Sequence, residues 1–439
     1  MTKISSAIYW ISIYLAIVFA PLFVLLLGPV PPGSGFWWDF SMALGFTAIA
    51  MMGVQFILTA RFRRVVTPFG IDIVYFFHRY LGVMALTFIV VHYLIIRINR
   101  AEVLGALNPL QAPWYMTLGR LAFLLFATII ITSLWRKRLK IHYDEWRMLH
   151  IGLSTMGFIL ALGHIEGVSY YIDAPVKHAL WISYIIFWLL LIVYVRLVKP
   201  WQMHNRPYRV VEVQQECNNC CTLVLEPIHH KGINFNPGQF AWLTLRASPF
   251  HIKEHPFSIS SSAAQQGKVA FTIKALGDFT RTIKDTQVGE TAYLDGPYGV
   301  FSTDCYPAAP GFVFIAGGIG AAPIMSMLRT MADRHEQRPL LFIYANDSWD
   351  NVIFKEELDT LKTRLNLNLV HVLKEPAPGW NGESGFVTPE LLQKVLLKEA
   401  QEYEYFLCGP KPMSNAVQQG LHNLKVPLGR VHFELFDMV

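Results

Sequence analysis

Four histidines in the first half of the sequence have a spacing that could hold two metal ions. His78 and His92 lie 14 residues apart in an apolar stretch, and His150 and His164 repeat that spacing in a second one. Fourteen residues of α-helix advance roughly 21 Å and return almost to the same face, so each stretch would present two imidazoles at two matching depths. Paired neutral imidazoles are suitable axial ligands for haem iron, and the pattern predicts two haem groups held between two helices. A lone histidine in such a stretch more often hydrogen-bonds to a neighbouring helix, but equal spacing in both stretches favours haem ligation.

These histidines lie among segments that are apolar enough to cross a membrane. Hydrophobic residues make up 53% of the 439 residues and charged residues only 15%, which excludes a wholly soluble protein. A run of about 20 apolar residues spans the bilayer as an α-helix. Such runs cover residues 8–27, 40–60, 80–96, 114–135, 151–165 and 179–198. The sequence therefore predicts a six-helix haem-binding transmembrane domain over residues 1–203, with the first run retained as a helix rather than cleaved as a signal peptide.

Basic residues indicate how the six predicted helices are oriented. Clusters of lysine and arginine follow the second, fourth and sixth runs; they are Arg61, Arg63, Arg64, Arg136, Lys137, Arg138, Lys140, Arg196, Lys199, Arg206 and Arg209. Cytoplasmic ends of membrane helices are enriched in such residues, and only Arg97 and Arg100 oppose the trend. We therefore predict a multi-pass protein of the cell (inner) membrane, with both termini and the C-terminal half in the cytoplasm. The two histidine-bearing helices then run parallel, which pairs His78 with His150 near the inner surface and the other two histidines near the outer one.

Three arginines in or beside these helices could bind the carboxylates of haem. Arg79 and Arg147 adjoin the predicted inner ligands, and Arg120 lies inside the fourth run, where an unpaired charge is costly enough to require a partner. We expect haem propionates to be those partners. For Arg79 and Arg147, the alternative is that their side chains simply extend to the polar surface of the membrane.

The composition changes near residue 200, and the expected fold changes with it. Residues 204–305 contain short alternating apolar stretches separated by Gly, Pro and Asn, a pattern typical of a small antiparallel β-barrel. In residues 306–439, strand-like stretches alternate with helical ones, which predicts a parallel sheet covered by helices. The expected fold class is a multi-domain membrane protein with a six-helix α transmembrane bundle, an antiparallel β-barrel domain and an α/β parallel-sheet domain.

Five short motifs in these two regions resemble those of ferredoxin-reductase-type flavin and nicotinamide domains. The flavin motifs comprise His255, Pro256, Phe257, Ser258, Ile259 and Ser260, then Gly277, Asp278, Phe279 and Thr280, then Gly296, Pro297, Tyr298 and Gly299. The nicotinamide motifs comprise Gly317, Gly318, Gly320 and Pro323, then Cys408, Gly409 and Pro410. Glycines between a strand and a helix let the backbone approach a pyrophosphate, which the helix N-terminus attracts. Each motif alone is weak, since small residues are common at turns, but their order and spacing are specific.

Together with the membrane helices, these motifs make the whole chain resemble the transmembrane NADPH oxidase and ferric reductase family. The resemblance implies that Ser258 and its neighbours contact the flavin ring, that residues 277–280 bind the FAD pyrophosphate, and that Cys408 lies near the reactive nicotinamide carbon. For Cys408, the alternative is a buried structural cysteine. The resemblance also implies a C-terminal aromatic residue that shields the flavin, a place that Met438 holds here and that Phe436 could fill instead.

The resemblance implies an oxidoreductase that passes electrons from cytoplasmic NADH or NADPH through FAD and two b-type haems to an acceptor on the outer side. The acceptor would be oxygen, giving superoxide, or a ferric chelate. Oxygen-reducing relatives carry a further histidine where this chain has Ile96, which argues against a dedicated oxygen site. Two alternatives stay open: the chain reduces a quinone or a periplasmic protein partner, or its helices only anchor a soluble-type flavin reductase. The lipid bilayer is an expected partner and nucleic acid is not.

The residues after the second strand of the α/β region bear on nucleotide preference. Asp347 follows that strand, and its carboxylate would accept a hydrogen bond from a ribose 2′-hydroxyl and repel a 2′-phosphate. This predicts that NADH is used at least as efficiently as NADPH. Two alternatives are that Asp347 only starts a turn or caps a helix, and that Arg329 or Arg334 reaches a 2′-phosphate from the neighbouring helix.

A group of cysteines precedes these motifs. Cys217, Cys220 and Cys221 lie close together in the sequence, with His229 and His230 nearby. A structural zinc site needs a second, spaced pair of ligands, which this stretch lacks, so we expect a group of reduced thiols.

Overall fold

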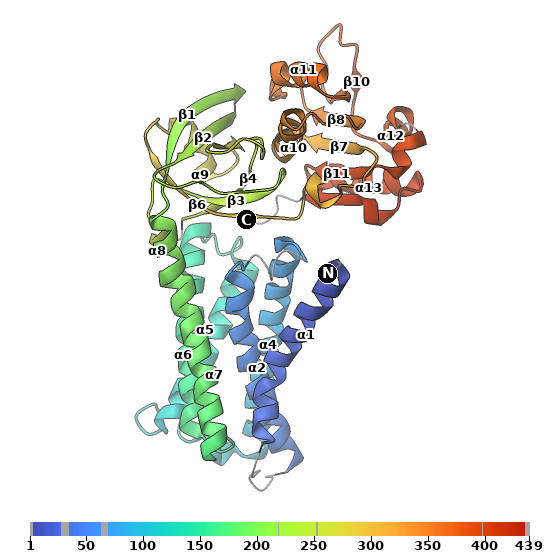
Figure 1. The fold of residues 1–439 in the computed structure, drawn as a ribbon. Coiled ribbons are helices and arrows are strands. Elements are labelled where there is room, and N and C mark those ends of the chain that lie inside the picture. Colours follow the sequence, from blue (N-terminus) through green and yellow to red (C-terminus); the bar gives the residue numbers. More distant parts are fainter. Residues whose placement is uncertain are drawn as a thin grey trace. The chain divides into compact units, whose positions relative to one another are not determined.

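The computed structural model describes residues 3–27, 35–62, 69–217, 219–251, 253–396 and 398–434. The chain divides into two compact units, Met1–Pro200 and Trp201–Val439 (Figure 1). Four residues to which the sequence assigned a role, Arg63, Arg64, Phe436 and Met438, lie outside the described residues.

The first unit consists of long apolar helices (Figure 1). They are α1 (Lys3–Leu25), α2 (Phe36–Thr59), α4 (Ile71–Asn99), α5 (Trp114–Trp135), α6 (Tyr143–Val168) and α7 (Pro175–Val193), which continues through a π-helical turn (Tyr194–Val198) into α8 (Lys199–His204). Within the described residues, six helices are long and apolar enough to cross a membrane, as predicted. Helices α4 and α6 begin earlier than the apolar runs, because the turns that carry His78 and His150 are helical too.

These helices form two close pairs, α2 with α4 and α5 with α6, and aromatic rings fill the space between α2, α6 and α7. Trp188 of α7 is fully buried, and Gly53 of α2 leaves room for it, since a Cβ there would lie 2.6 Å from the indole ring. The ring of Phe158 on α6 lies 5.3 Å from that of Phe56 and 6.1 Å from that of Trp188, measured between centroids. Helix association inside a bilayer depends on such close packing of small against large residues.

The second unit begins with an antiparallel sheet, in the strand order β4-β3-β6-β1-β2-β5. Its strands are β1 (Tyr208–Cys217), β2 (Cys220–Pro227), β3 (Phe240–Leu245), β4 (His255–Ser258), β5 (Val269–Lys274) and β6 (Thr291–Tyr298). A bridge from Ile259, directly after β4, to Phe271 of β5 joins the two edge strands, and both side chains are fully buried in the core that the sheet encloses. The antiparallel fold predicted for this region is confirmed.

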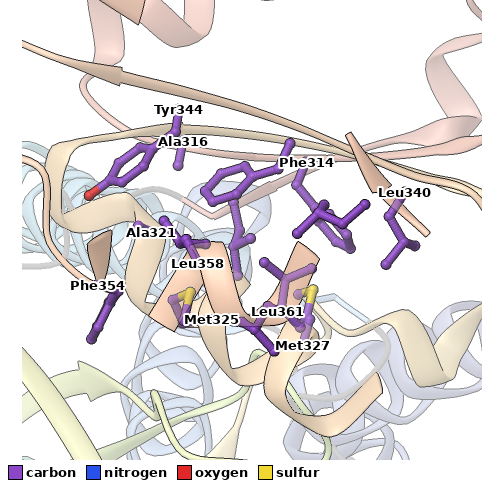
Figure 2. Close-up of a cluster of buried hydrophobic side chains, with 14 of the residues drawn as sticks. Phe314, Ala316, Ala321, Met325, Met327, Leu340, Tyr344, Phe354, Leu358 and Leu361 are labelled. Carbon is purple, nitrogen blue, oxygen red and sulfur yellow. The ribbon is translucent and has the colours of Figure 1, made fainter. Parts of the chain in front are cut away.

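A parallel sheet follows, in the order β10-β9-β8-β7-β11-β12. Its strands are β7 (Phe312–Gly317), β8 (Leu340–Asn346), β9 (Leu367–Leu373), β10 (Glu383–Ser384), β11 (Glu404–Cys408) and β12 (Val431–Glu434). Helices α10 (Ala321–Asp333) and α11 (Lys355–Arg364) cover one face, where they enclose the core shown in Figure 2. Helices α12 (Pro389–Val395) and α13 (Lys411–Asn423) cover the other face. The α/β prediction is confirmed as well.

The strand order of the parallel sheet reverses between β7 and β11. From β7 the chain moves outward through β8 and β9, and it later returns to the other side of β7 to form β11 and β12. In open α/β sheets, ligands bind in the crevice outside the carboxyl ends of the strands at such a reversal. The turns that follow β7 and β11 therefore flank the expected ligand crevice.

Candidate functional site

The four predicted metal-binding histidines lie on α4 and α6, one helix from each close pair. The rings of His78 and His150 have their centroids 6.0 Å apart, at an interplanar angle of 58°. Metal–nitrogen bonds to imidazole are about 2 Å long, so two imidazoles on opposite sides of one metal ion have ring centres roughly 6 Å apart. His92 and His164 form the other pair and are close enough to interact electrostatically. The structure thus places His78 beside His150 and His92 near His164, and their role as metal ligands stays a prediction.

Three of these histidines have a hydrogen-bond partner at Nδ1. Nδ1 of His92 lies 2.8 Å from the backbone oxygen of Ser41, Nδ1 of His164 lies 2.9 Å from that of Tyr115, and Nδ1 of His150 lies 3.2 Å from a hydroxyl group. A histidine that donates its Nδ1–H to a carbonyl presents the lone pair of Nε2, which is the usual arrangement for a metal ligand. No hydrogen bond between described residues occupies Nε2 of these three side chains. Nδ1 of His78 is buried and has no partner among the described residues.

Glycine residues make room for the rings of His92 and His164. A Cβ at Gly119 of α5 would lie 2.8 Å from Nδ1 of His164, closer than real Cβ contacts permit. A Cβ at Gly45 of α2 would lie 3.4 Å from the ring of His92. The pairing, the fixed Nδ1 groups and these glycines fit two groups of the haem type, each held by one histidine of α4 and one of α6.

The three arginines that we expected to bind haem propionates have different surroundings. Arg120 donates to the backbone oxygens of Ala106 and Leu104, each at 2.6 Å, so it holds the loop between α4 and α5. Arg79 is exposed and Arg147 is partly buried. The structure gives the Arg120 charge a set of partners that the sequence did not suggest, and the propionate role of all three arginines stays a prediction.

In the second unit, the first two flavin motifs lie side by side. The motif of residues 255–260 forms β4 and the two residues after it, and the imidazole of His255 stacks on Phe279 of the second motif, with 4.0 Å between centroids and 18° between planes. Thr280 accepts hydrogen bonds from the backbone N–H groups of Leu276 and Gly277, at 2.9 and 2.8 Å. Nothing lies within 4 Å of the position that a Cβ of Gly277 would take. The two motifs thus form one surface with an open backbone segment, suited to contact a ligand.

The two glycines of the third flavin motif are required by the local packing and backbone conformation. A Cβ at Gly296 would lie 2.7 Å from the side chain of Ala241 on β3, and Gly299 has a φ of 98°, which favours glycine. Between them, the hydroxyl group of Tyr298 donates to the carboxylate of Asp295 at 2.6 Å. In this structure, these residues pack the end of β6 against β3, and a contact with FAD remains a prediction.

The two nicotinamide motifs meet at the reversal of the parallel sheet. A Cβ at Gly320 would lie 2.1 Å from the backbone oxygen of Cys408, and a Cβ at Gly409 would lie 3.0 Å from the backbone nitrogen of Gly317. Only glycine allows the turn after β7 to approach the turn after β11 so closely. Gly318 has a φ of 52° and open space at its Cβ position. The structure therefore brings together two motifs that lie about 90 residues apart in the chain.

Cys408 ends β11 and is fully buried. Burial, reinforced by the carboxylate of Glu434, raises the pKa of its thiol well above the ordinary value, so the thiol stays protonated. Glu434 is the register partner of Cys408 on β12 and is itself 92% buried. Glu434 is not among the residues expected from the sequence, where its only signal is an acidic residue between apolar ones in the last strand.

The charged groups near the predicted 2′-position of the nucleotide also have defined partners. Asp347 is exposed directly after β8. The guanidinium of Arg329 forms a two-point ion pair with Glu357, at 2.7 and 2.5 Å, and donates to the backbone oxygen of Ser260 at 2.6 Å. Arg334 pairs with Asp304 at 2.7 Å. Both arginines that could have bound a 2′-phosphate are engaged elsewhere.

Arg329 belongs to a row of contacts that joins α10 to the end of the first flavin motif and to the segment after it. The sequence did not predict these contacts. Ser326 donates to the backbone oxygen of Ser261 at 2.7 Å, and Thr330 accepts from the backbone N–H of Ala263 at 2.8 Å. α10 begins directly after the glycine-rich turn at Gly320. One helix therefore connects the predicted nucleotide turn to the predicted flavin motif.

Comparison with known families gives three matches along the chain. Residues 44–162 match the ferric reductase like transmembrane component, residues 203–302 an FAD-binding domain, and residues 314–419 the oxidoreductase NAD-binding domain. The flavin motifs fall within the second match, and both nicotinamide motifs fall within the third. Three of the four predicted metal-binding histidines fall within the first match, and His164 lies just beyond its end.

Individual relatives cover only part of the chain. The glycine betaine monooxygenase reductase subunit of Pseudomonas aeruginosa is 28% identical over 247 residues, which are 54% of this chain and 66% of that protein. NADH-cytochrome b5 reductase 1 of Debaryomyces hansenii is 33% identical over 170 residues, or 37% of this chain and 58% of that protein. The chain thus spans less than two thirds of the length of these curated relatives.

Solved structures show similar partial matches. The flavohem-like FAD/NAD-binding domain of nitric oxide dioxygenase from Vibrio cholerae O1 biovar El Tor is 23% identical, with a TM-score of 0.46 over 53% of this chain and 98% of that one. The ferredoxin reductase in carbazole 1,9a-dioxygenase is 24% identical, with a TM-score of 0.47 over 53% of this chain and 69% of that one.

Proposed function

Since the chain belongs to the transmembrane NADPH oxidase and ferric reductase family, with FAD-binding and NAD-binding domains fused behind ferric-reductase-like helices, we propose that it carries electrons from a nicotinamide nucleotide through FAD and two haems to an acceptor across the membrane. That it is a multi-pass membrane oxidoreductase follows from its domains and its six apolar helices. The two haems, the direction of transfer and the acceptor are the proposal.

The observation that supports the haem route best is the spacing of the histidine rings. His78 and His150 stand 6.0 Å apart on facing helices, a distance suited to one metal ion between them. Haem iron would supply one-electron chemistry there, and FAD would convert hydride transfer into single electrons. His78 with His150 would hold one haem and His92 with His164 the other, and the haems would supply one-electron transfer to the acceptor.

The chain's own groups would orient the nucleotide beside the flavin. Bare backbone at Gly318 and the adjoining start of α10 would hold the pyrophosphate, because the N–H groups and the helix dipole attract anions. Cys408, protonated and at the carboxyl end of β11, would border the nicotinamide ring without acting as a nucleophile. Phe436 and Met438 stay candidates for the group that covers the flavin.

NADH is the proposed nucleotide, used at least as efficiently as NADPH. Asp347 would meet the ribose 2′-hydroxyl as a hydrogen-bond acceptor, and its charge would repel a 2′-phosphate. The ion pairs of Arg329 with Glu357 and of Arg334 with Asp304 support this preference, since both guanidinium groups already have carboxylate partners.

A visible spectrum and an acceptor panel on purified full-length protein test the proposed function. We expect FAD and two haems per chain, with haem reduction on anaerobic addition of NADH. Oxygen, with and without superoxide dismutase, a ferric chelate and a quinone then distinguish the acceptors. Protein that contains FAD and reduces acceptors but has no haem would show that the helices are only an anchor.

A further inference from the structure

The group of cysteines at the turn between β1 and β2 has no part in the proposed electron route. Cys217 ends β1, Cys220 begins β2, and the two are register partners. Register partners in an antiparallel pair point to the same face, with Cα atoms about 4.5–5.5 Å apart, which lies within the range that a disulfide requires. Both thiols donate to the same side-chain oxygen of Asn219, at 3.6 and 3.5 Å, and they also contact each other. Both are reduced in this structure.

The other described cysteines lack this geometry. Cys221 is the register partner of Gln215 and is buried in the core of the antiparallel sheet. Cys305 is exposed, and its thiol contacts a backbone oxygen. Metal binding is a poor alternative for the pair, because no group of three or more His, Cys, Asp or Glu side chains that could hold a metal occurs in the described part of the chain.

The pair also contacts the nucleotide half of the second unit. Cys220 and Tyr344 both belong to the buried cluster on the α10 face of the parallel sheet, and Cys217 packs against that cluster. Tyr344 lies beside Ala316 at one end of the cluster (Figure 2). Its hydroxyl group donates to the backbone oxygen of Gly318 at 3.2 Å. Tyr344 thus joins the cluster that contains Cys220 to the glycine-rich turn.

We propose that Cys217 and Cys220 form a reversible disulfide in the presence of a hydroperoxide, and that this bond weakens nucleotide binding at the turn supported by Tyr344. The second part rests on the proposed nucleotide site. Cys217 is the partly exposed thiol and reacts first, whereas burial, with the neighbouring Cys217 thiol as a further cause, raises the pKa of Cys220 to about 12.

The reaction balances with the hydroperoxide as the oxidant. The Cys217 thiol loses its proton and the thiolate attacks one oxygen of hydrogen peroxide. The O–O bond breaks, the leaving hydroxide takes that proton as water, and a sulfenic acid remains on Cys217. Cys220 then attacks that sulfur, the S–S bond forms, and the leaving hydroxide takes the Cys220 proton as a second water. Two thiols are oxidised and one peroxide is reduced. The sulfurs end about 2 Å apart, so both side chains must change their packing against the cluster that contains Tyr344.

The test uses the full-length protein in detergent under anaerobic conditions. Hydrogen peroxide is added at about one equivalent, free thiols are alkylated, and disulfides are mapped by peptide mass spectrometry; the Kd for NAD+ is measured before and after. We expect one disulfide, Cys217 to Cys220, that dithiothreitol reverses, and a rise in Kd of about threefold or more. The variants Cys221→Ser and Cys305→Ser should behave like the wild type, and Cys220→Ser should form no such bond and keep its Kd.

Three results would overturn the proposal: no Cys217–Cys220 bond, earlier oxidation of another cysteine, or a complete bond with an unchanged Kd. The wild-type mapping decides the first two even where a variant fails to fold. Failure of the reduced protein to bind NAD+ at all would instead remove the proposed nucleotide site, and with it the effect on binding, while the mapping would still decide the thiol chemistry.

Discussion

At the scale of single residues, the histidines carry most of the functional proposal. Each pair takes one ring from α4 and one from α6, and Nδ1 of both His92 and His164 lies against a backbone oxygen of a neighbouring helix. Such contacts fix the tautomer and the orientation of each ring, and they leave Nε2 available to bind a metal.

Loss of one outer histidine should therefore remove one haem. We expect His164→Leu to lower the haem content from two to one per chain while flavin reduction by NADH is unaffected, because the flavin motifs lie in the other unit. Haem and FAD are measured by absorbance against protein concentration. His178→Leu is the matched control, since His178 is an exposed histidine paired with Glu166 rather than with another histidine. A His164→Leu protein that keeps two haems per chain would contradict the ligand assignment.

Asp347 permits a test of nucleotide preference at one position. We expect Asp347→Arg to raise the ratio of kcat/KM for NADPH to that for NADH about tenfold, because an arginine can bind a 2′-phosphate that a carboxylate repels. Asp350→Arg adds the same charge three residues further along and should change the ratio much less. A wild-type kcat/KM for NADPH ten or more times that for NADH would show that Asp347 does not set the preference.

At the scale of elements, the turns after β7 and β11 depend on close backbone contact. We expect Gly320→Ala to destabilise the second unit by roughly 1–3 kcal/mol, because the new Cβ would meet the backbone oxygen of Cys408 at 2.1 Å. The melting temperature should fall by several degrees and NADH binding should weaken. Gly429→Ala is the control, since a Cβ there meets nothing within 4 Å. Equal melting temperatures for the two variants would contradict the close approach.

A second prediction at the scale of elements concerns the contacts of helix α10. Arg329 is 20% exposed and holds both Glu357 and the backbone of Ser260, whereas the Arg334 side chain is 48% exposed and holds one carboxylate. We expect Arg329→Ala to lower FAD retention and stability clearly more than Arg334→Ala does, because an exposed ion pair contributes little. Gel filtration followed by flavin quantification measures retention. Similar FAD loss in both variants would mean that α10 does not support the flavin motif.

The elements themselves were largely predictable from sequence, since periodicity and turn residues are local signals. The six membrane helices, the antiparallel sheet and the parallel sheet all follow from such patterns. The contacts of Arg329 and Glu434 were not predictable, because their partners lie far along the chain and carry no periodic signal. Those of Arg120 were not predictable because its partners are backbone oxygens of a loop, which no residue type marks. Arg120 shows the limit best: its charge signalled that a partner must exist, but not that backbone oxygens of a loop would supply it.

At the scale of the whole molecule, electrons are proposed to cross the membrane in one direction. The excess of lysine and arginine after the second, fourth and sixth helices predicts that nucleotide is oxidised on the cytoplasmic side and the acceptor is reduced on the other. The histidine pairs at two depths of α4 and α6 would provide the route between the two surfaces.

Sealed right-side-out vesicles that contain the protein, FAD and haem measure this electron transfer directly. A membrane-impermeant ferric chelate is placed outside, and NADH is supplied either inside or outside. We predict reduction of the chelate only with NADH inside, and its loss in the His164→Leu protein. Equal reduction with NADH supplied only outside, or full activity without the outer haem, would contradict electron transfer across the membrane through the histidine pairs.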